Sequence, residues 1–329
     1  MRICVFGAGA IGAYLGACLT ERGQHDVVLV ARGERLAAMR HGGVRIEGPG
    51  AGARTVRVRG ADDAAALPAQ DVVFLTTKSH DAPRAAAALA KLVGERGTLV
   101  TAMNGVPWWY FQGLAGQHQD RILRSVDPDG ALGGAIPAAQ IVGAVVWTAA
   151  TMRAPGVIAV EQLLRLPLGE ACGGRSARVD GLAATLRDAG VESTALEDIR
   201  AEVWLKLWGN LAFNPVSVLT RASLAGIARD AGGRAAVRAM MVEAEQVANA
   251  LGVRFPVDVD RRIAMAETIG AHATSSLQDL DAGKEIELAA LTGAVLEMAA
   301  LTGVETPTIA LIHGLTLLRM RVRDADTRR

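Results

Sequence analysis

The chain has 329 residues, half of them hydrophobic, and its 35 basic residues nearly balance 34 acidic ones, which leaves a formal net charge of +1. Because such a chain carries no strong field of either sign, its composition argues against nucleic acid or an anionic membrane as a partner and favours a small molecule. The length exceeds the size at which one hydrophobic core usually stops growing, so we expect two domains.

The chain opens with the pattern of a dinucleotide-binding unit: an apolar run, Ile3–Phe6, then a glycine-rich turn, a helical pattern and a second apolar run. The turn consists of Gly7, Ala8, Gly9, Ala10, Ile11 and Gly12. In such a unit the first glycine permits a tight turn, the second leaves room for a phosphate, and the third lets the helix pack on the strand. Because the helix N-terminus then faces the anion, we expect these six residues to bind the cofactor.

The end of the second strand indicates which dinucleotide is bound. NAD-binding units usually place Asp or Glu about 20 residues after the glycine turn, where it binds the ribose 2′-hydroxyl. Here the strand Asp26–Val30 is followed by Ala31 and Arg32, and the planar guanidinium suits a 2′-phosphate. The sequence therefore favours NADPH, and the nearby Glu34 keeps NADH as the alternative.

Cysteine usage and the uncharged N-terminal run bear on the compartment. Cys4, Cys18 and Cys172 show no spacing typical of a disulfide framework or a metal site, which favours a reducing cytoplasm and no metal. The uncharged run from Ile3 to Thr20 is interrupted by glycines and follows a strand–turn–helix pattern. We therefore expect neither a membrane span nor a signal peptide.

Further strands follow the first unit. Short strand patterns cover Val44–Ile46 and Thr55–Val58, and longer apolar runs at Asp71–Thr77 and Gly97–Ala102 flank an alanine-rich helix. The two longer runs have the composition of buried strands in a parallel sheet. The expected fold class is α/β, with an N-terminal Rossmann-type doubly wound sheet.

Polar residues stand just beyond both buried strands. Lys78 follows the first of them and Asn104 follows the second. Since ligands of open α/β sheets lie outside the carboxyl ends of the strands, we expect both side chains near the ligand.

The middle of the chain is less regular. The aromatic segment Trp108–Phe111 is open to two interpretations, a hydrophobic lid over the ligand or packing in a core or subunit interface. A strand-like run covers Ile141–Thr148, and a helical pattern over Leu182–Ala189 ends at Gly190.

From Ile199 almost to the C-terminus, apolar residues recur at helical spacing. We therefore expect an all-helical C-terminal domain, with the boundary close to residues 190 to 198. The two domains are an NADP-binding Rossmann-type domain over residues 1–190 and a helical substrate and catalytic domain over residues 191–329.

The first long helix of this second half carries a polar stripe. Lys206, Asn210 and Asn214 are spaced i, i+4 and i+8, so an amine and two amides share one face amid apolar residues. Burying them without partners is costly, and an anionic ligand with a carbonyl group would supply partners. A solvated polar stripe is the alternative, but asparagine is a poor residue for a helix interior.

Two later segments have ordinary explanations when taken alone. The run from Thr274 to Asp279 has the composition of a helix cap. The run Lys284–Glu287 begins another helical pattern, where acidic residues are favoured by the helix dipole.

The order of these features resembles the ketopantoate reductase (2-dehydropantoate 2-reductase) family over nearly the whole chain. The matching features are the glycine turn, Lys78, Asn104-Gly105, the helix with Lys206, Asn210 and Asn214, and the segment from Ser275 to Glu287. The resemblance implies a Rossmann domain followed by an all-helical domain, with Lys78 and Asn104 at the cofactor and substrate cleft.

The resemblance also implies roles in the reaction. The family's Lys-x-x-x-Asn-x-x-x-Asn helix makes Lys206 the general acid and places Asn210 and Asn214 at the substrate. The family's glutamate follows a Ser-x-x-x-Asp segment by eight residues, which gives Ser275 as a substrate-binding serine and Glu287 as the catalytic glutamate. Glu285 is the alternative if the register differs.

The implied activity is NADPH-dependent reduction of 2-dehydropantoate (ketopantoate) to pantoate, in pantothenate biosynthesis, by hydride transfer. Two alternatives stay open: an NADPH-dependent reductase of another 2-keto acid or an imine, and a non-catalytic NADP(H)-binding regulator. The expected partner is a small-molecule 2-keto acid. The apolar helix faces are compatible with a homodimer or with packing inside one chain.

Overall fold

A computed structural model describes residues 1–48, 52–268, 270 and 272–327, and the chain falls into two units. Unit 1 comprises Met1–Met103, Pro107–Ile122 and Asp127–Ile199. Unit 2 comprises Asn104–Val106, Leu123–Val126 and Arg200–Arg329. Two short segments from the first half of the sequence therefore belong with the second unit.

The elements of unit 1 alternate between strands and helices at first, and then β3, β4 and β5 follow one another directly. In chain order they are β1 (Arg2–Phe6), α1 (Ala10–Glu21), β2 (Asp26–Val30), α2 (Gly33–Gly42), β3 (Val44–Glu47), β4 (Arg54–Val56), β5 (Arg59–Ala61), η1 (Ala64–Ala66), β6 (Val72–Leu75), η2 (Ser79–Asp81), η3 (Pro83–Ala85), α3 (Ala86–Val93), β7 (Thr98–Thr101), α4 (Ala131–Ala135), η4 (Ala138–Gln140), β8 (Ile141–Ala144), β9 (Trp147–Ala154), β10 (Val157–Arg165), β11 (Leu168–Glu170) and α5 (Ala177–Asp188).

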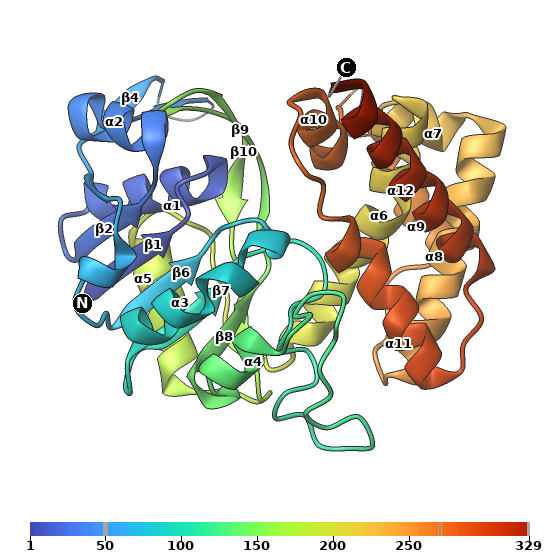
Figure 1. Ribbon diagram of the computed structural model, residues 1–329, viewed down its shortest axis with the longest axis horizontal. Helices are drawn as coiled ribbons and strands as arrows, with labels where there is room; N and C mark the ends of the chain where they lie inside the picture. The colour runs from blue at the N-terminus through green and yellow to red at the C-terminus, as the bar shows by residue number, and fades with distance from the viewer. Residues whose placement is uncertain (49–51, 269, 271, 328–329) are drawn as a thin grey trace. The chain divides into compact units, whose positions relative to one another are not determined.

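A seven-stranded sheet forms the centre of unit 1 (Figure 1). Its order is β11-β8-β7-β6-β1-β2-β5, and neighbours are parallel except β11, which pairs antiparallel with β8. From β1 the chain adds β2 and β5 on one side and then β6, β7 and β8 on the other. This is the order of a doubly wound nucleotide-binding sheet, and its direction reverses between β1 and β6. The predicted Rossmann-type sheet is confirmed.

Helix α1 is buried along most of its length. A second sheet, in the order β4-β3-β10-β9, packs on α1, which also packs on β1 and β2. The residues from Gly12 to Leu19 are all buried. A helix covered on all sides must be apolar on all sides, which explains the uncharged run noted in the sequence. Among the described residues, no helix has the length and apolar character needed to cross a membrane.

Two of the cysteines are part of this packing. Cys4 lies in β1 and Cys18 in α1, and both are buried. Burial raises the pKa of the Cys4 thiol to about 12 and that of the Cys18 thiol to about 11. Both are protonated at neutral pH and pack as small apolar side chains.

Three expected elements of unit 1 were wrong in extent. The strand expected at Thr55–Val58 ends at Val56 in β4, and β5 begins only at Arg59, whereas the run Ile141–Thr148 is divided between β8 and β9. In both cases the chain crosses from one sheet to the other, which an apolar run does not reveal. The helix expected from Leu182 begins at Ala177, because the Ser176 hydroxyl caps it there by accepting a hydrogen bond from a backbone N–H.

The aromatic segment Trp108–Phe111 lies in the core of unit 1. All four side chains are at most 2% exposed. Trp109 Nε1 donates a hydrogen bond to Thr101 Oγ1 (2.8 Å), and the ring packs against Gly143 of β8. Of the two interpretations, core packing is the one that the structure supports.

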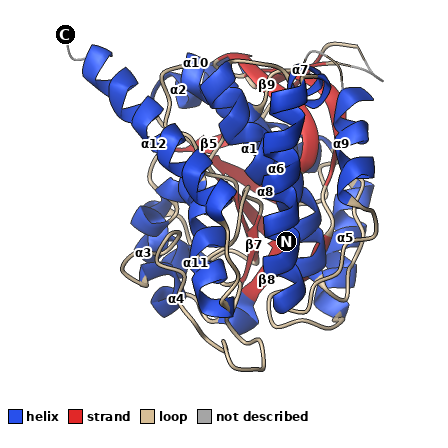
Figure 2. Cartoon of the chain, turned by 90° about the vertical axis from the view of Figure 1, so that its right-hand side faces the viewer, coloured by secondary structure: helices blue, strands red, loops and turns tan. Residues whose placement is uncertain are grey.

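The regular secondary structure in the described part of unit 2 is helical, with loops between the helices (Figure 2). Its elements are α6 (Ile199–Thr220, which begins at the last residue of unit 1), α7 (Leu224–Arg229), α8 (Ala231–Ala250), α9 (Val259–Thr268), α10 (Ser275–Asp281), the π-helical turn η5 (Ala289–Gly293), α11 (Ala294–Thr302) and α12 (Pro307–Thr327). The predicted all-helical C-terminal domain is confirmed.

The core of unit 2 forms around α6 and α8. Trp204 and Trp208 of α6 are fully buried, and Trp208 Nε1 donates to the Met241 carbonyl of α8 (2.7 Å). The Trp208 ring also stacks on Phe255, with 4.0 Å between ring centroids. These contacts hold α6 in a defined rotation, so the direction in which its polar stripe faces is set by large aromatic side chains.

Candidate active site

The glycine turn follows β1, at the point where the sheet reverses direction. The N–H groups of Gly7 and Ala8 both donate to the Val30 carbonyl at the end of β2 (3.2 and 3.1 Å), and Gly9 N–H donates to Gly7 O (2.9 Å). The chain therefore folds back tightly before it enters α1. The amides of Gly7, Ala8 and Gly9 are therefore all used inside the protein.

Helix α1 begins with backbone amides that have no partner within the helix. Ala13 N–H makes the first helical hydrogen bond, to Gly9 O (2.9 Å), so the amides of Ala10, Ile11 and Gly12 precede the helical ladder. A Cβ built on Gly9 would meet nothing within 4 Å. The turn thus combines N–H donors, the positive end of a helix dipole and open space.

Gly12 is required by a close approach between helix and turn. A Cβ at this position would lie 2.2 Å from Gly7 O and 2.4 Å from Thr76 Oγ1. Thr76 Oγ1 itself donates to Gly7 O (2.7 Å) and fastens the turn to the end of β6. The third glycine of the motif therefore permits the packing expected of it.

Arg32 and Lys78 lie beyond the ends of the two strands next to β1 and the turn. Arg32 precedes α2, is exposed, and makes no hydrogen bond or ion pair with any described residue. Lys78 follows β6, precedes η2 and is half-buried. Glu34, the residue that kept NADH as an alternative, is exposed in the first turn of α2.

The polar stripe of α6 has three different environments. Asn214 is 5% exposed and Lys206 and Asn210 are half-buried. The Asn210 amide has no hydrogen-bond partner among the described residues, whereas Asn214 Nδ2 donates to Ser276 Oγ (3.1 Å). A partly buried amide of this kind is satisfied by water or by a ligand.

Asn104 joins the lysine of the stripe to a carboxylate. Lys206 Nζ donates to Asn104 Oδ1 (2.6 Å), and Asn104 Nδ2 donates to Glu287 Oε2 (3.2 Å). All three residues belong to unit 2, although Asn104 is more than one hundred residues away from the others in sequence. An ammonium group, an amide and a buried carboxylate thus form one connected chain of hydrogen bonds.

Gly105 explains how Asn104 comes to belong to unit 2. Val106 N–H donates to the Ala290 carbonyl in the π-helical turn η5 (2.9 Å), and a Cβ on Gly105 would lie 2.6 Å from both Cβ and O of Ala290. Gly105 also has a φ of +83°, which favours glycine. The short segment therefore docks against the turn that directly follows Glu287.

The two glutamates of the Lys284–Glu287 segment differ in burial. Glu287 is 6% exposed and bonded to Asn104, whereas Glu285 is exposed. The geometry brings Glu287, and not Glu285, into the hydrogen-bonded chain with Lys206.

The Thr274–Asp279 segment contains one pairing that the sequence did not indicate. Thr274 Oγ1 accepts a hydrogen bond from Leu277 N–H (3.2 Å) and caps α10, as a purely structural interpretation expects. Ser275 is exposed, and its neighbour Ser276 is the buried partner of Asn214. Two adjacent serines give no sequence signal for which one faces α6.

These features define the class of the protein. Unit 1 has a doubly wound nucleotide-binding sheet with a glycine turn at its reversal point. Unit 2 presents a lysine that is hydrogen-bonded through an amide to a carboxylate. This combination is typical of an oxidoreductase that acts on CH–OH groups.

Comparisons with known proteins agree with this class. The family model described as ketopantoate reductase PanE/ApbA matches residues 3–172, and the model of that family's C-terminal region matches residues 198–319. The 2-dehydropantoate 2-reductase of Mesorhizobium japonicum is 45% identical over 96% of this chain and 96% of its own length. This chain belongs to the ketopantoate reductase family.

Solved structures show the same fold over the whole chain. A candidate ketopantoate reductase from Ralstonia solanacearum superposes with a TM-score of 0.92 at 39% identity, covering 98% of both chains. The 2-dehydropantoate 2-reductase of Methylococcus capsulatus gives a TM-score of 0.81 at 30% identity, with 98% of this chain and 97% of the other covered.

Proposed function

We propose that the protein reduces 2-dehydropantoate (ketopantoate) to pantoate with NADPH, and so serves pantothenate biosynthesis. The observation that carries the proposal is the hydrogen-bonded chain from Lys206 through Asn104 to Glu287. The names of the relatives supply the substrate, and the residues supply a mechanism for it.

In this proposal unit 1 binds the dinucleotide. The amides of Ala10, Ile11 and Gly12 suit the pyrophosphate, and the open space at Gly9 fits the approach of a phosphate. Arg32 suits a 2′-phosphate because it is exposed and unengaged among the described residues, and Lys78 adds a second cation beyond β6. When bound, the reduced nicotinamide supplies a hydride to the ketone carbon.

Lys206 acts as the general acid in the proposed reaction. As the ketone carbon is reduced, negative charge develops on the ketone oxygen, and an ammonium group beside it stabilises that charge and donates a proton. Lysine is ordinarily protonated at neutral pH. Asn104 fixes the direction of the Lys206 ammonium, and the buried carboxylate of Glu287 orients Asn104 and favours the charged amine.

The amides of Asn210 and Asn214 and the hydroxyl of Ser275 would hold the carboxylate and hydroxyl groups of the substrate. Asn210 is unpaired among the described residues and Ser275 is exposed, so both are accessible to a ligand. Asn214 is buried against Ser276, so its contribution includes positioning of α10. Holding the substrate in one orientation makes hydride transfer effectively unimolecular.

One assay tests cofactor, reaction class and substrate together. The purified protein is mixed with NADPH or NADH and with ketopantoate or other 2-keto acids, and nucleotide oxidation is followed at 340 nm. We expect the highest kcat/KM with NADPH and ketopantoate. A higher value with another 2-keto acid would replace the proposed substrate, and tight NADPH binding without turnover on any ketone would indicate a non-catalytic regulator.

The two glutamates provide a matched pair of variants. Glu287→Gln keeps the shape and the acceptor oxygen but removes the charge behind Asn104, so we expect turnover to fall about 10- to 100-fold. Glu285→Gln changes an exposed side chain two residues away and should leave turnover within about twofold. Steady-state kinetics on both variants, with melting temperatures as a check of folding, measure the contrast. A larger loss in Glu285→Gln would transfer the role to Glu285.

A further inference from the structure

The guanidinium of Arg262 packs against α6 at a position where that helix has no side chain. A Cβ built on Gly209 would lie 2.7 Å from Nη2 and 3.3 Å from Cζ of Arg262. Gly209 is buried in the interior of α6, and the space left by its missing side chain is what admits the guanidinium of α9.

This position is adjacent to the candidate site. Gly209 follows Lys206 by three residues and directly precedes Asn210. Residues three apart on a helix are surface neighbours, with about 5–6 Å between their Cβ positions. The guanidinium therefore lies beside the turn of α6 that carries the proposed acid, Lys206.

Arg262 has no protein partner in the described part of the chain. No hydrogen bond or ion pair from its guanidinium to another described residue exists, and the side chain is partly buried. Burial lowers the pKa of the Arg262 guanidinium, although it stays charged at neutral pH. A partly desolvated cation without a counter-charge is unfavourable, and an anionic ligand would relieve it.

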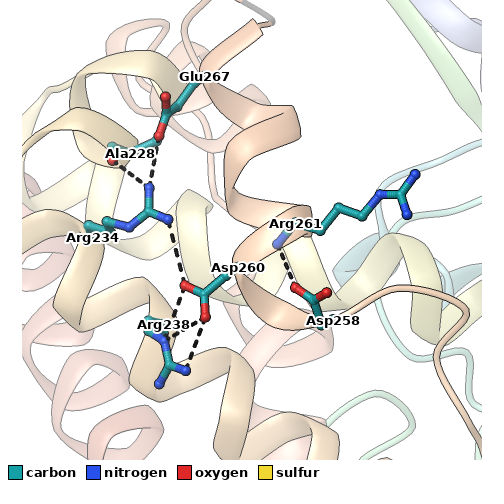
Figure 3. A network of polar contacts seen from close by, with 7 residues as sticks. All are labelled: Ala228, Arg234, Arg238, Asp258, Asp260, Arg261 and Glu267. Carbon is teal, nitrogen blue, oxygen red and sulfur yellow. Dashed lines mark hydrogen bonds and ion pairs between the residues drawn. The ribbon is translucent and has the colours of Figure 1, made fainter.

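The acidic residues of α9 are engaged elsewhere. Asp260 pairs with Arg234 (3.6 Å) and with Arg238 (3.1 Å), and Glu267 pairs with Arg234 (2.8 Å). Figure 3 shows Asp260 between the two arginines. Asp260 and Arg262 are two residues apart, which places them on opposite sides of the helix. The pairing of α9 with α8 through these carboxylates therefore leaves Arg262 unneutralised.

Asp258, just before α9, is engaged too: its carboxylate accepts a hydrogen bond from the Arg261 backbone N–H (2.7 Å), as Figure 3 also shows. The Arg261 side chain is exposed. The two adjacent arginines thus carry the same charge on the same helix, but only Arg262 faces α6.

We propose that Arg262 binds the carboxylate of the 2-keto acid, and this inference rests on the proposed function. A guanidinium presents a planar fork of N–H donors that matches a carboxylate, with shorter and stronger hydrogen bonds than a neutral amide makes. Arg262 would fix the charged end of the substrate while Lys206 takes the ketone oxygen. It selects for 2-keto acids over uncharged ketones.

The test separates substrate binding from chemistry. Arg262→Gln should raise KM for ketopantoate about 10- to 100-fold, the usual value of a hydrogen bond to a charged group, with kcat changed less than about threefold. The KM of Arg262→Lys should lie between those of the wild type and Arg262→Gln, since lysine keeps the positive charge but lacks the planar fork of N–H donors. The matched control is Arg261→Gln, which should leave KM within about twofold.

A second variant moves the guanidinium without removing it. Gly209→Ala places a methyl group 2.7 Å from Nη2, so the flexible end of the Arg262 side chain must move aside, and it improves the helix propensity of α6. We therefore expect that the melting temperature does not fall while KM rises. Equal KM values for Arg262→Gln and Arg261→Gln, or a loss confined to kcat, would overturn the inference and leave the proposed function intact. A wild-type protein that reduces no 2-keto acid would overturn both.

Discussion

Replacing Lys206 with alanine is expected to lower turnover by about two to four orders of magnitude while NADPH still binds. The ammonium is the proposed proton donor to the developing alkoxide, and removing it leaves negative charge on the ketone oxygen without its main stabilising group. The side chain lies in unit 2, whereas the glycine turn, Arg32 and Lys78 lie in unit 1, so the loss should affect kcat much more than the dissociation constant of NADPH.

The matched control for this variant is Lys284→Ala. Lys284 is an exposed lysine of the same unit, and among the described residues its hydrogen bonds, to Asp279 and from Arg323, involve its backbone alone. We expect its turnover to stay within about twofold of wild type. Single-turnover kinetics with NADPH fluorescence separate binding from hydride transfer in each variant. Unchanged turnover in Lys206→Ala would remove this residue from the mechanism.

The second large effect is expected in the glycine turn, where two alanine substitutions should act differently. In Gly12→Ala the new methyl group would lie 2.2 Å from Gly7 O, and relief requires movement of the backbone, so the turn must open. We expect a melting temperature several degrees lower because of the overpacking. We also expect NADPH affinity to fall at least about 100-fold, because the open turn no longer forms the anion site as well.

In Gly9→Ala the methyl group meets nothing within 4 Å of the protein, and the backbone at this residue, with φ −73°, accepts alanine without strain. The melting temperature without ligand should therefore stay within about one degree of wild type, as for most substitutions at exposed positions. The methyl group would occupy the place where the phosphate approaches, so NADPH affinity should still fall about tenfold or more. Normal NADPH binding by Gly9→Ala would show that the turn does not hold the pyrophosphate.

The parts of the fold that the sequence predicted are those set by local patterns. The strand–turn–helix at the N-terminus and the i, i+4, i+8 stripe of α6 follow from residue spacing alone, and buried parallel strands are recognised by unbroken apolar runs. The extents of Thr55–Val58 and Ile141–Thr148 were wrong because the chain leaves one sheet within each run, and a pattern of hydrophobicity does not record which sheet a strand joins.

The candidate site depends on contacts between distant residues. Asn104 stands after a strand of unit 1, yet Gly105 docks it against Ala290 of unit 2, so its place follows from a steric fit 185 residues away in sequence. Ser276 rather than Ser275 meets Asn214 because of the rotation of α10, which packing decides.

Arg262 gave no signal of its own in the sequence. In Asp260-Arg261-Arg262 it has the composition of an ordinary charged helix surface, and only the missing side chain at Gly209 distinguishes it from its neighbour. A glycine in the interior of a helix costs stability relative to alanine, so its presence in α6 is itself a sequence feature that packing against a guanidinium explains.

The burial of α1 between two sheets constrains the order in which the chain reaches its native state. Strand β10 (Val157–Arg165) pairs in parallel with β3, more than one hundred residues earlier, and helps to cover α1. During synthesis the apolar helix therefore emerges from the ribosome long before its cover, and it stays exposed to solvent or to chaperones until β10 is made. A nucleotide-binding fragment that ends just after β7 would lack β10 and would leave the apolar surface of α1 exposed permanently. The N-terminal half of this enzyme is therefore not expected to fold as an independent domain when it is moved to another protein.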